Sequence, residues 1–292
     1  MAKGLGGSAQ PMRRYISAAA RQRGASGWLG RCEGRRLHCF SSWWNSPVGT
    51  FILQSFSIVA FLLAWHLFAT IPRAVPIPAP GDALQAALSL DPARLLRDCL
   101  LSFYRVGLGF IIAALLGIPL GIIIGFWMPA KALLFPAVEI LRPIPPIAWI
   151  PLAILFFPKI EWMIVFLTFY GAFFPIVYNT IAGIAEIPKA YIRAARSLGA
   201  GPWTLFWEVM VPAMLPSIFT GLYIAIGIAW LMVVAGEMMA VTGGIGALTW
   251  QAYQTSQYPL IFVGMAAIGV LGYASSQLVR SVARRVIRWE VS

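Results

Sequence analysis

The chain has 292 residues, of which 60% are hydrophobic and 11% charged, and its mean hydropathy is +0.79. So few polar side chains cannot cover a soluble globule of this length, and the apolar runs are continuous, which excludes the alternating pattern of a membrane β-barrel. We therefore predict an all-α polytopic membrane protein. The net charge of +12 does not indicate a nucleic-acid partner, because the basic residues concentrate at the chain ends and beside apolar runs.

The reactive side chains indicate neither a catalytic site nor a metal site. Cys32, Cys39 and Cys99 lack the spacing of a disulfide framework or a zinc site, and the two histidines, His38 and His66, lie far from any catalytic partner. No Gly-x-x-x-x-Gly-Lys-Ser/Thr pattern occurs, so the glycine-rich loop at 242–246 is not expected to bind phosphate. We predict a non-enzymatic chain that binds no metal, no ATP and no other cofactor.

Residues 1–47 contain eight Lys and Arg but one acidic residue, Glu33, among many Gly, Ser and Ala. This composition predicts a flexible, basic cytoplasmic tail. An Arg-rich, acid-poor start is also typical of an organellar transit peptide. The apolar run that follows is too long for a secretory signal core, and we interpret it as the first membrane span.

Six apolar runs predict six membrane spans, with both termini on the same side. They cover 48–71, 100–126, 132–157, 162–185, 210–241 and 259–279. Sixteen Lys and Arg would lie on the side of the termini, and four, Arg73, Arg94, Arg97 and Lys159, on the other. The positive-inside rule therefore places both termini and the loop at 186–209 in the cytoplasm.

Residues 72–99 are predicted to form an external connector between the first two spans. Four prolines in its first half precede a stretch at 82–98 with helical spacing of Ala and Leu, which predicts an interfacial helix; a plain connector is the alternative. Residues 100–280 would then form the membrane core, and 281–292 a second basic cytoplasmic tail.

The second span contains Gly117, Gly121 and Gly125, spaced four residues apart on one helix face. Bare backbone at this spacing predicts close packing against another helix. Pro119 lies in the same stretch and is a candidate for a kink.

The third span carries an unusual density of proline between Glu139 and Pro151. Because proline lacks a backbone N–H, a regular helix cannot run through this stretch, whose prolines are Pro143, Pro145, Pro146 and Pro151. Broken backbone at membrane depth is tolerated where protein or a water-filled cavity satisfies its carbonyl groups. We predict that residues 142–151 face a central cavity, with Trp149 as a gate or wall.

Ionisable side chains within the spans are candidate pathway residues. Glu139 and Arg142 are three residues apart and either neutralise each other near the cytoplasmic boundary or line the pathway. Glu237 has no basic residue near it in sequence, and it either faces solvent at the external end of its span or has a functional role.

A polar, gently basic segment interrupts the apolar sequence between the fourth and fifth spans. Residues 189–198 predict about three turns of helix with Ala194, Ala195 and Leu198 near one side, small enough to enter a groove on a partner. Gly199 can end this helix with a positive φ, and Gly201-Pro202 can start the next. The alternative to a docking helix is an ordinary amphipathic loop helix.

This segment resembles the cytoplasmic signature of binding-protein-dependent ABC importer permeases, Glu-Ala-Ala-x3-Gly-x9-Ile-x-Leu-Pro. Ala194, Ala195, Gly199 and Pro212 match the signature, whereas Arg193 replaces its acidic residue. The run at 142–151 is similar to the Arg-Pro-x-Pro-x-x-Ala-Trp-x-Pro stretch of permeases grouped with nitrate, sulfonate, taurine and bicarbonate importers. The resemblance covers about residues 80–280 and leaves the N-terminal tail unexplained.

The resemblance implies a type I importer permease in a bacterial-type inner membrane. Docking of the ATPase subunit would fall to Arg193, Ala194, Ala195, Leu198, Gly199, Ala200, Gly201 and Pro212. The implied partners are a second, most often identical permease copy, two ATPase subunits that hold ATP and Mg, and an external or periplasmic solute-binding protein. ATP-driven closure of the ATPases would move the docking helices and turn the pathway outward.

The substrate implied by the resemblance is a small oxyanion or an organic sulfonate. A pyrimidine-like nitrogenous precursor is the alternative within the same family. An ion-coupled secondary transporter is a rival from another class, which inverted repeats and several intramembrane ionisable groups would favour.

Overall fold

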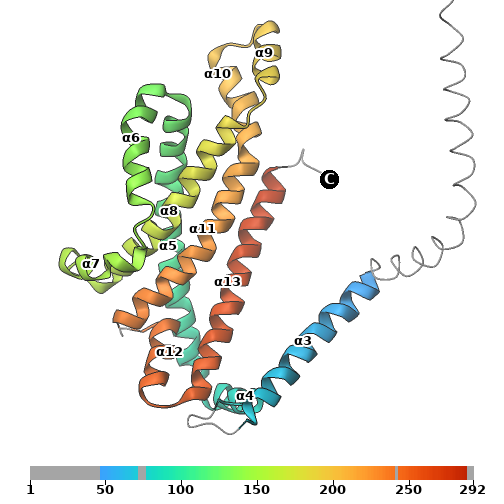
Figure 1. Cartoon of the computed structure of the whole chain (residues 1–292), viewed down its shortest axis with the longest axis vertical. Helices are drawn as coiled ribbons and strands as arrows, with labels where there is room; N and C mark the ends of the chain where they lie inside the picture. The colour runs from blue at the N-terminus through green and yellow to red at the C-terminus, as the bar shows by residue number, and fades with distance from the viewer. Residues whose placement is uncertain (1–46, 72–76, 241–242, 288–292) are drawn as a thin grey trace, which may run out of the picture. The chain divides into compact units, whose positions relative to one another are not determined.

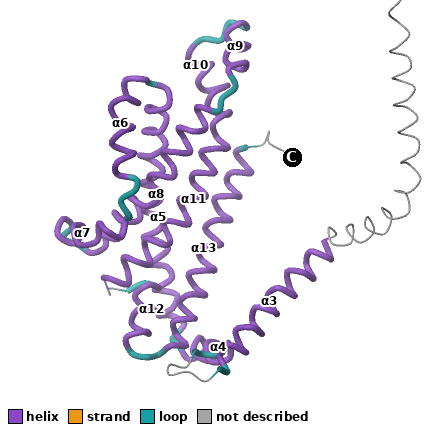
Figure 2. Tube along the Cα trace, in the orientation of Figure 1, coloured by secondary structure: helices purple, strands orange, loops and turns teal. Residues whose placement is uncertain are grey.

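The computed structural model describes residues 47–71, 77–240 and 243–287 (Figure 1). Every regular element in these ranges is a helix, as Figure 2 shows, so the predicted all-α class is confirmed. The chain divides into two units, residues 1–71 and 72–292, which are described separately. The predicted basic tail lies outside the described residues except for Pro47.

The first unit contributes one helix, α3 (Pro47–Ala69). Its segment Phe51–Ala69 is long and apolar enough to cross a membrane. This agrees with the span predicted at 48–71. Large apolar side chains such as Phe51, Phe56 and Phe61 are exposed along it, as expected where lipid is the solvent.

The second unit is a bundle built on four long helices. These are α5 (Pro92–Phe126), α8 (Ile160–Ala185), α11 (Val211–Ala240) and α13 (Tyr258–Val286). Each belongs to a segment that is long and apolar enough to span a membrane. The described residues therefore contain five continuous candidate spans, and six if the bent third segment is included.

Glycine allows α5 and α8 to pack closely along their length. A Cβ added at Gly121 would lie 2.6 Å from the Cβ of Thr180, and Gly109 stands in the same relation to Thr168. Gly117 and Gly125 face Ile176 and Ile184. In all four pairs the partners are 59 residues apart, so the two helices run parallel and in constant register. The predicted glycine packing face is confirmed.

Helix α8 also packs against α11, on a different set of side chains. A Cβ at Gly221 would lie 2.7 Å from the Cβ of Asn179, and one at Gly183 equally close to the Cβ of Ser217. Here the residue number falls on one helix as it rises on the other, so these helices are antiparallel. Two close contacts place α8 in the middle of the bundle.

The predicted third span is not a straight helix. It consists of α6 (Met128–Leu141), the 3-10 helix η1 (Pro146–Trp149) and α7 (Ile150–Phe156), with a bend of 87° at the break. The expected interruption is confirmed, and Pro151 lies in the first turn of α7, where no intrahelical donor is needed. The third span predicted at 132–157 thus corresponds to a bent pair of helices, because the prolines between Leu141 and Ile147 prevent α6 from continuing.

Helix boundaries differ from the prediction in two places, one in the external region and one near the C-terminus. The stretch at 82–98 is not one helix, since α4 (Pro80–Ser89) ends before Leu90 and α5 begins at Pro92. Asp91 ends this break by accepting a hydrogen bond from the backbone N–H of Ala93, as an N-cap does. At the other end of the chain, α13 extends to Val286, beyond the predicted boundary at 280.

A short helix, α12 (Ile245–Gln254), was missed in the stretch predicted as a loop between the last two spans. It packs against α11, α13 and α5, and α4 packs against α13. In Figure 1, α4 and α12 lie at one end of the bundle and the short helices α9 and α10 at the other.

Candidate functional site

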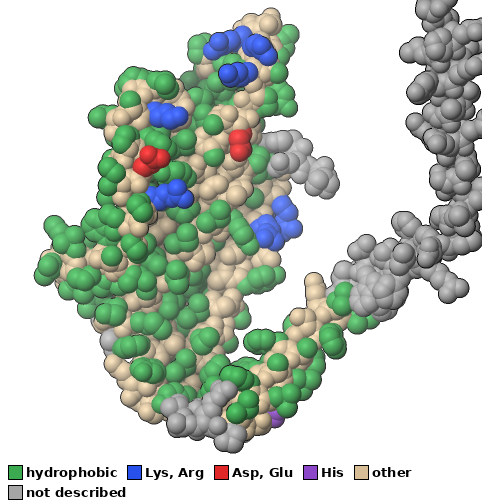
Figure 3. All heavy atoms as spheres, in the orientation of Figure 1, with side chains coloured by type: hydrophobic (Ala, Val, Ile, Leu, Met, Phe, Trp, Pro, Cys, Tyr) green, Lys and Arg blue, Asp and Glu red, His purple; other side chains and the backbone are tan. Residues whose placement is uncertain are grey.

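The predicted docking helix is present as α9 (Lys189–Ser197), and it projects from one end of the bundle (Figure 1). Arg193, Ala194 and Leu198 are exposed, and Leu198 shows 88% of its surface. Basic side chains gather at this end above a surface covered largely by apolar side chains (Figure 3). None of the described residues buries the Leu198 side chain, which lies near the basic residues of α9.

The turn after α9 has the predicted backbone. Gly199 has a φ of +83°, and its N–H donates to the carbonyl of Arg196. The N–H of Ala200 donates to the carbonyl of Ala195, which completes the C-terminal cap. Gly201 precedes α10 (Pro202–Thr204), so the predicted restart at Gly201-Pro202 is also confirmed.

The segment that joins the docking helix to α11 is a π-helix, η2 (Leu205–Met210). It ends directly before Val211 and Pro212, the last residues of the cytoplasmic signature. A proline removes one backbone donor and crowds the carbonyl four residues earlier, here that of Glu208. The wider turns of a π-helix therefore occur where Pro212 makes a regular α-helix unfavourable.

Arg142 follows α6 at the start of the break and reaches across to α8. Its guanidinium carbon lies 4.4 Å from the centre of the Tyr178 ring, a cation–π contact. Together these residues line a cavity of about 390 Å³. The break contributes Arg142, Ile144 and Pro146 to this cavity; α8 contributes Tyr170, Gly171, Phe174, Pro175, Tyr178 and Asn179; and α11 contributes Ile224 and Ile228.

Glu139 and Pro143 line a neighbouring, more open cavity together with Arg142 and Tyr178. Within the described part of the chain no ion pair joins Glu139 to Arg142. The interpretation of these two residues as a mutually neutralising pair is therefore wrong, because the turn after Leu141 carries the guanidinium to Tyr178 instead. The surface of Glu139 is exposed.

Trp149 packs inside the bundle instead of facing these two cavities. Its ring centre lies 5.2 Å from that of Tyr170 and 6.3 Å from that of Phe166. Pro145 is exposed and lines neither cavity. The predicted exposure of 142–151 to a cavity thus holds for Arg142, Pro143, Ile144 and Pro146, and the gating role of Trp149 stays a prediction.

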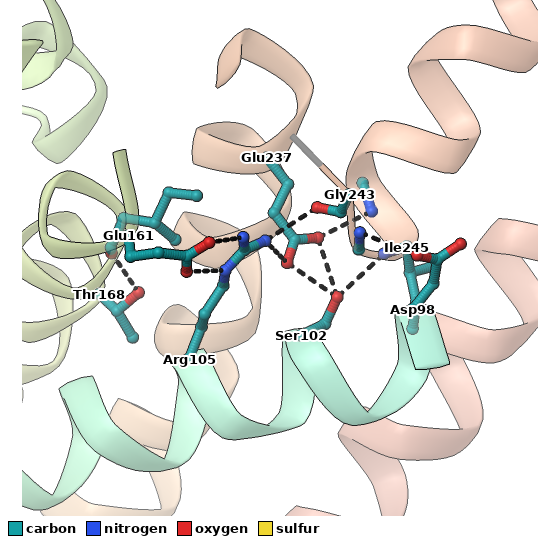
Figure 4. A network of polar contacts seen from close by, with 11 residues as sticks. Asp98, Ser102, Arg105, Glu161, Thr168, Glu237, Gly243 and Ile245 are labelled. Carbon is teal, nitrogen blue, oxygen red and sulfur yellow. Dashed lines mark hydrogen bonds and ion pairs between the residues drawn. The ribbon is translucent and has the colours of Figure 1, made fainter. Parts of the chain in front are cut away.

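Glu237 lies in the most elaborate polar network of the described structure (Figure 4). Its carboxylate is fully buried and pairs at 2.8 Å with Arg105 of α5, which is also fully buried. The same guanidinium forms a two-bond fork with Glu161 of α8, at 2.8 and 2.6 Å. The solvent-facing alternative for Glu237 is therefore wrong, since the network joins three helices in the bundle interior.

The backbone of the glycine-rich loop before α12 forms hydrogen bonds with carboxylates of the same chain. The N–H of Gly246 donates to Glu237 at 2.9 Å, and the N–H of Gly244 donates to Asp98 at 3.2 Å. The carbonyl of Gly243 accepts from Arg105 at 2.8 Å. Gly243 and Gly244 have φ of +112° and +101°, a backbone that other residues rarely adopt. The loop thus uses a helix N-terminus to bind anionic side chains.

Sequence reasoning missed the α5 side of this network. Asp98, Ser102 and Arg105 recur at intervals of four and three residues, which places them on one face of the helix. Ser102 donates to Glu237 at 2.8 Å and accepts from the N–H of Ile245 at 2.9 Å. That spacing is the signal that would have identified a buried partner for Glu237.

The comparison with protein families identifies the chain from residue 117 to residue 289. This range matches the model described as "Binding-protein-dependent transport system inner membrane component". The match covers more than half of the chain and includes the proline break, the docking helix and the α12 loop.

Curated relatives match over most of their length. The taurine transport system permease protein TauC of Escherichia coli is 31% identical over 87% of this chain and 96% of its own. The bicarbonate transport system permease protein CmpB of Synechococcus elongatus is 33% identical, with 84% and 92% covered. A putative ABC transporter permease protein of Methanocaldococcus jannaschii is 38% identical, with 68% and 75% covered.

A solved structure of the MetNI methionine ABC transporter, in an inward-facing conformation, shares the fold. It matches with a TM-score of 0.52 at 20% identity, over 69% of this chain and 98% of the other. With the signature around Gly199 and the matched range of 117–289, these findings show that the chain belongs to the binding-protein-dependent inner membrane components and is a multi-pass permease subunit of the ABC importer type.

Proposed function

We propose that this chain forms the translocation pathway of an ATP-driven importer for a small oxyanion or an organic sulfonate. The observation that carries the proposal is α9, an exposed helix that ends at Gly199 and presents Leu198 and small side chains beyond the bundle. Such a surface needs a partner. In an importer that partner is an ATPase subunit, and two copies of each would make the working complex.

The docking surface consists of Arg193, Ala194, Ala195, Leu198, Gly199, Ala200 and Gly201, with Pro212 as support. The first seven lie on α9 and its terminal turn, and Pro212 lies at the start of α11. Movement of α9 would pass through η2 into α11, which lines the cavity near Arg142 at Ile224 and Ile228. Arg193 replaces the acidic residue of the family signature, so its contact with the ATPase would differ in charge.

The names of the relatives support a substrate that carries an oxyanion or a sulfonate group, since they refer to taurine, bicarbonate and nitrate. The cavity agrees in charge, because Arg142 lines it and makes no ion pair with the described carboxylates. An external binding protein would deliver the substrate on the side of α4 and α12. The distribution of Lys and Arg supports placing α9 and both termini in the cytoplasm.

The decisive experiment is reconstitution of the permease with its ATPase subunits and its solute-binding protein. We expect ATP hydrolysis to rise when the loaded binding protein is added, with uptake of labelled taurine, bicarbonate or nitrate into proteoliposomes. Uptake of a pyrimidine instead of taurine, bicarbonate or nitrate would overturn the proposed substrate class. Uptake driven by an ion gradient without ATP would overturn the proposed mechanism.

A further inference from the structure

The cavity between the proline break and α8 contains a cation that forms no ion pair within the described residues. The Arg142 guanidinium donates no hydrogen bond to another described residue, and it contacts the Tyr178 ring. A guanidinium has five N–H donors, which point outward along its edge in a rigid fork. Contact with the face of an aromatic ring provides no hydrogen-bond acceptor for these edge N–H groups. The edge of Arg142 is therefore available to a ligand.

Two further donors line the same cavity. The Tyr178 hydroxyl makes no hydrogen bond with the rest of the described structure, and it lies beside Asn179 on α8. The Asn179 amide donates one N–H to the carbonyl of Pro175 at 2.8 Å, which leaves its second N–H free. The apolar groups around them, from Phe174, Ile224 and Ile228, exclude water from part of the cavity wall.

We infer that Arg142, Tyr178 and Asn179 form an oxyanion-binding site within the translocation pathway, a site that takes a planar or tetrahedral –XO₃ or –CO₂ group. This inference rests on the proposed function and adds that the permease itself selects its substrate. A guanidinium fork matches the paired oxygens of nitrate, bicarbonate or a sulfonate. The Tyr178 hydroxyl and the free N–H of the Asn179 amide would donate hydrogen bonds to the remaining oxygen.

The charge of the site favours monoanions. Glu139 lines the adjoining open cavity together with Arg142 and Tyr178, so one fixed negative charge lies beside the one fixed positive charge. Arg142 compensates one negative charge of a bound group, whereas the second charge of a dianion such as sulfate would lie uncompensated in a cavity that adjoins Glu139. Removal of the Glu139 charge should therefore relax discrimination against dianions.

Contacts with neighbouring helices fix the position of the side chains in this site. The Asn179 Cβ packs against Gly221 of α11, where an added Cβ would lie only 2.7 Å away. The neighbouring Tyr170 donates its hydroxyl hydrogen to the carbonyl of Leu141 at 2.7 Å, which fixes the end of α6 and thus the start of the Arg142 side chain. Preorganised donors lose little entropy on binding.

The test uses the full complex in proteoliposomes, with labelled taurine, bicarbonate and nitrate as probes and ATP hydrolysis measured in parallel. We expect Arg142→Gln to lower the amount of anion taken up per ATP hydrolysed by about tenfold or more, the loss typical of a charge-assisted hydrogen bond. Arg142→Lys keeps the charge but not the fork, and it should restore part of the uptake. A ratio of uptake to hydrolysis that is unchanged in Arg142→Gln would overturn the inference.

The chain offers a matched control in Arg280, which lies 4.9 Å from the centre of the Tyr223 ring on α11. Arg280→Gln removes the same charge and the same kind of aromatic contact away from this cavity, and we expect the uptake ratio to stay at the wild-type value. A fall equal to that of Arg142→Gln would show that the effect is one of net charge, and would overturn the site.

Two variants decide the matter if Arg142→Gln does not assemble. Tyr178→Phe keeps the ring beneath Arg142 but removes the hydroxyl, and Asn179→Asp replaces an amide donor by a repelling carboxylate. Both should lower the uptake ratio, with Asn179→Asp the stronger; wild-type ratios in both would overturn the site. Glu139→Gln should make uptake more sensitive to excess sulfate, and no change in that sensitivity would overturn the monoanion preference.

The two proposals fail in different ways. If the wild-type complex takes up none of taurine, bicarbonate and nitrate, the proposed substrate class is wrong. If the wild-type complex takes them up and the variants at Arg142, Tyr178 and Asn179 match it, only the binding site is wrong.

Discussion

Arg105 and Glu237 form an ion pair of 2.8 Å in which neither side chain exposes any surface, although 132 residues separate them in the chain. The pair connects α5 to α11 directly before the loop that leads into α12 (Figure 4). Because Gly243, Gly246 and Ser102 supply further hydrogen bonds, both charges are compensated within the bundle.

Loss of the buried carboxylate should destabilise the bundle more than loss of the half-exposed one. Glu237→Gln leaves Arg105 buried with one charged partner, and breaking such a pair costs about 3–5 kcal/mol. Glu161→Gln is the matched variant, because the Glu161 side chain is 48% exposed and water can replace part of what it provides. Thermal unfolding of the two purified variants in detergent measures the difference. A lower unfolding midpoint for Glu161→Gln than for Glu237→Gln would contradict this account.

The α5–α8 interface should reject a methyl group at one glycine and accept it at another. Gly121→Ala would place a Cβ 2.6 Å from the Cβ of Thr180 and 3.0 Å from the carbonyl oxygen of Val177, so we expect a loss of about 1–3 kcal/mol from overpacking. Gly107 lies on the same helix with nothing within 4 Å of an added Cβ, and Gly107→Ala should be neutral or stabilising. Equal unfolding midpoints for the two variants in detergent would show that the helices adjust freely.

The turn after α9 should require glycine for backbone reasons alone. An added Cβ at Gly199 meets nothing within 4 Å, but φ of +83° costs another residue about 1–2 kcal/mol. Gly199→Val should therefore stay in the membrane and lose the ATPase or its coupling. Gly81→Val is the control, since Gly81 lies in the first turn of α4, outside the docking surface, and an added Cβ there also meets nothing within 4 Å. Substrate-stimulated ATP hydrolysis at the wild-type rate in Gly199→Val would remove the docking role of this turn.

The proposed topology predicts opposite labelling at the two ends of α8. Lys159 precedes α8 and α9 follows it, so the 26 residues of α8 separate the two positions by about 39 Å. In a chain without its native cysteines, an impermeant thiol reagent added to intact cells should label Lys159→Cys and miss Ser197→Cys. Permeabilised cells provide the control, because both should then react. The reverse pattern in intact cells would place α9 outside and exclude docking of a cytoplasmic ATPase.

Local features of the sequence were enough to predict much of this molecule. Long apolar runs predict α3, α5, α8, α11 and α13, because a span without water must satisfy its backbone within one helix. The interruption at Pro143–Pro146 and the positive φ at Gly199 follow from the covalent structure of proline and glycine. The spacing of Gly117, Gly121 and Gly125 predicts a packing face, since a helix repeats its faces every three to four residues.

The partners across those faces were decided by the tertiary structure. The sequence shows Glu237 as an isolated acid, and folding places Arg105 and Ser102 against it. The sequence places Arg142 three residues from Glu139, whereas in the folded chain the Arg142 guanidinium contacts the Tyr178 ring. Helix α12 is too short for a periodic signal, and its first N–H groups are satisfied by Asp98 and Ser102 of α5 and by Glu237 of α11. Chain-local patterns fix which groups need a partner, whereas the identity of a partner on another helix depends on how the helices pack.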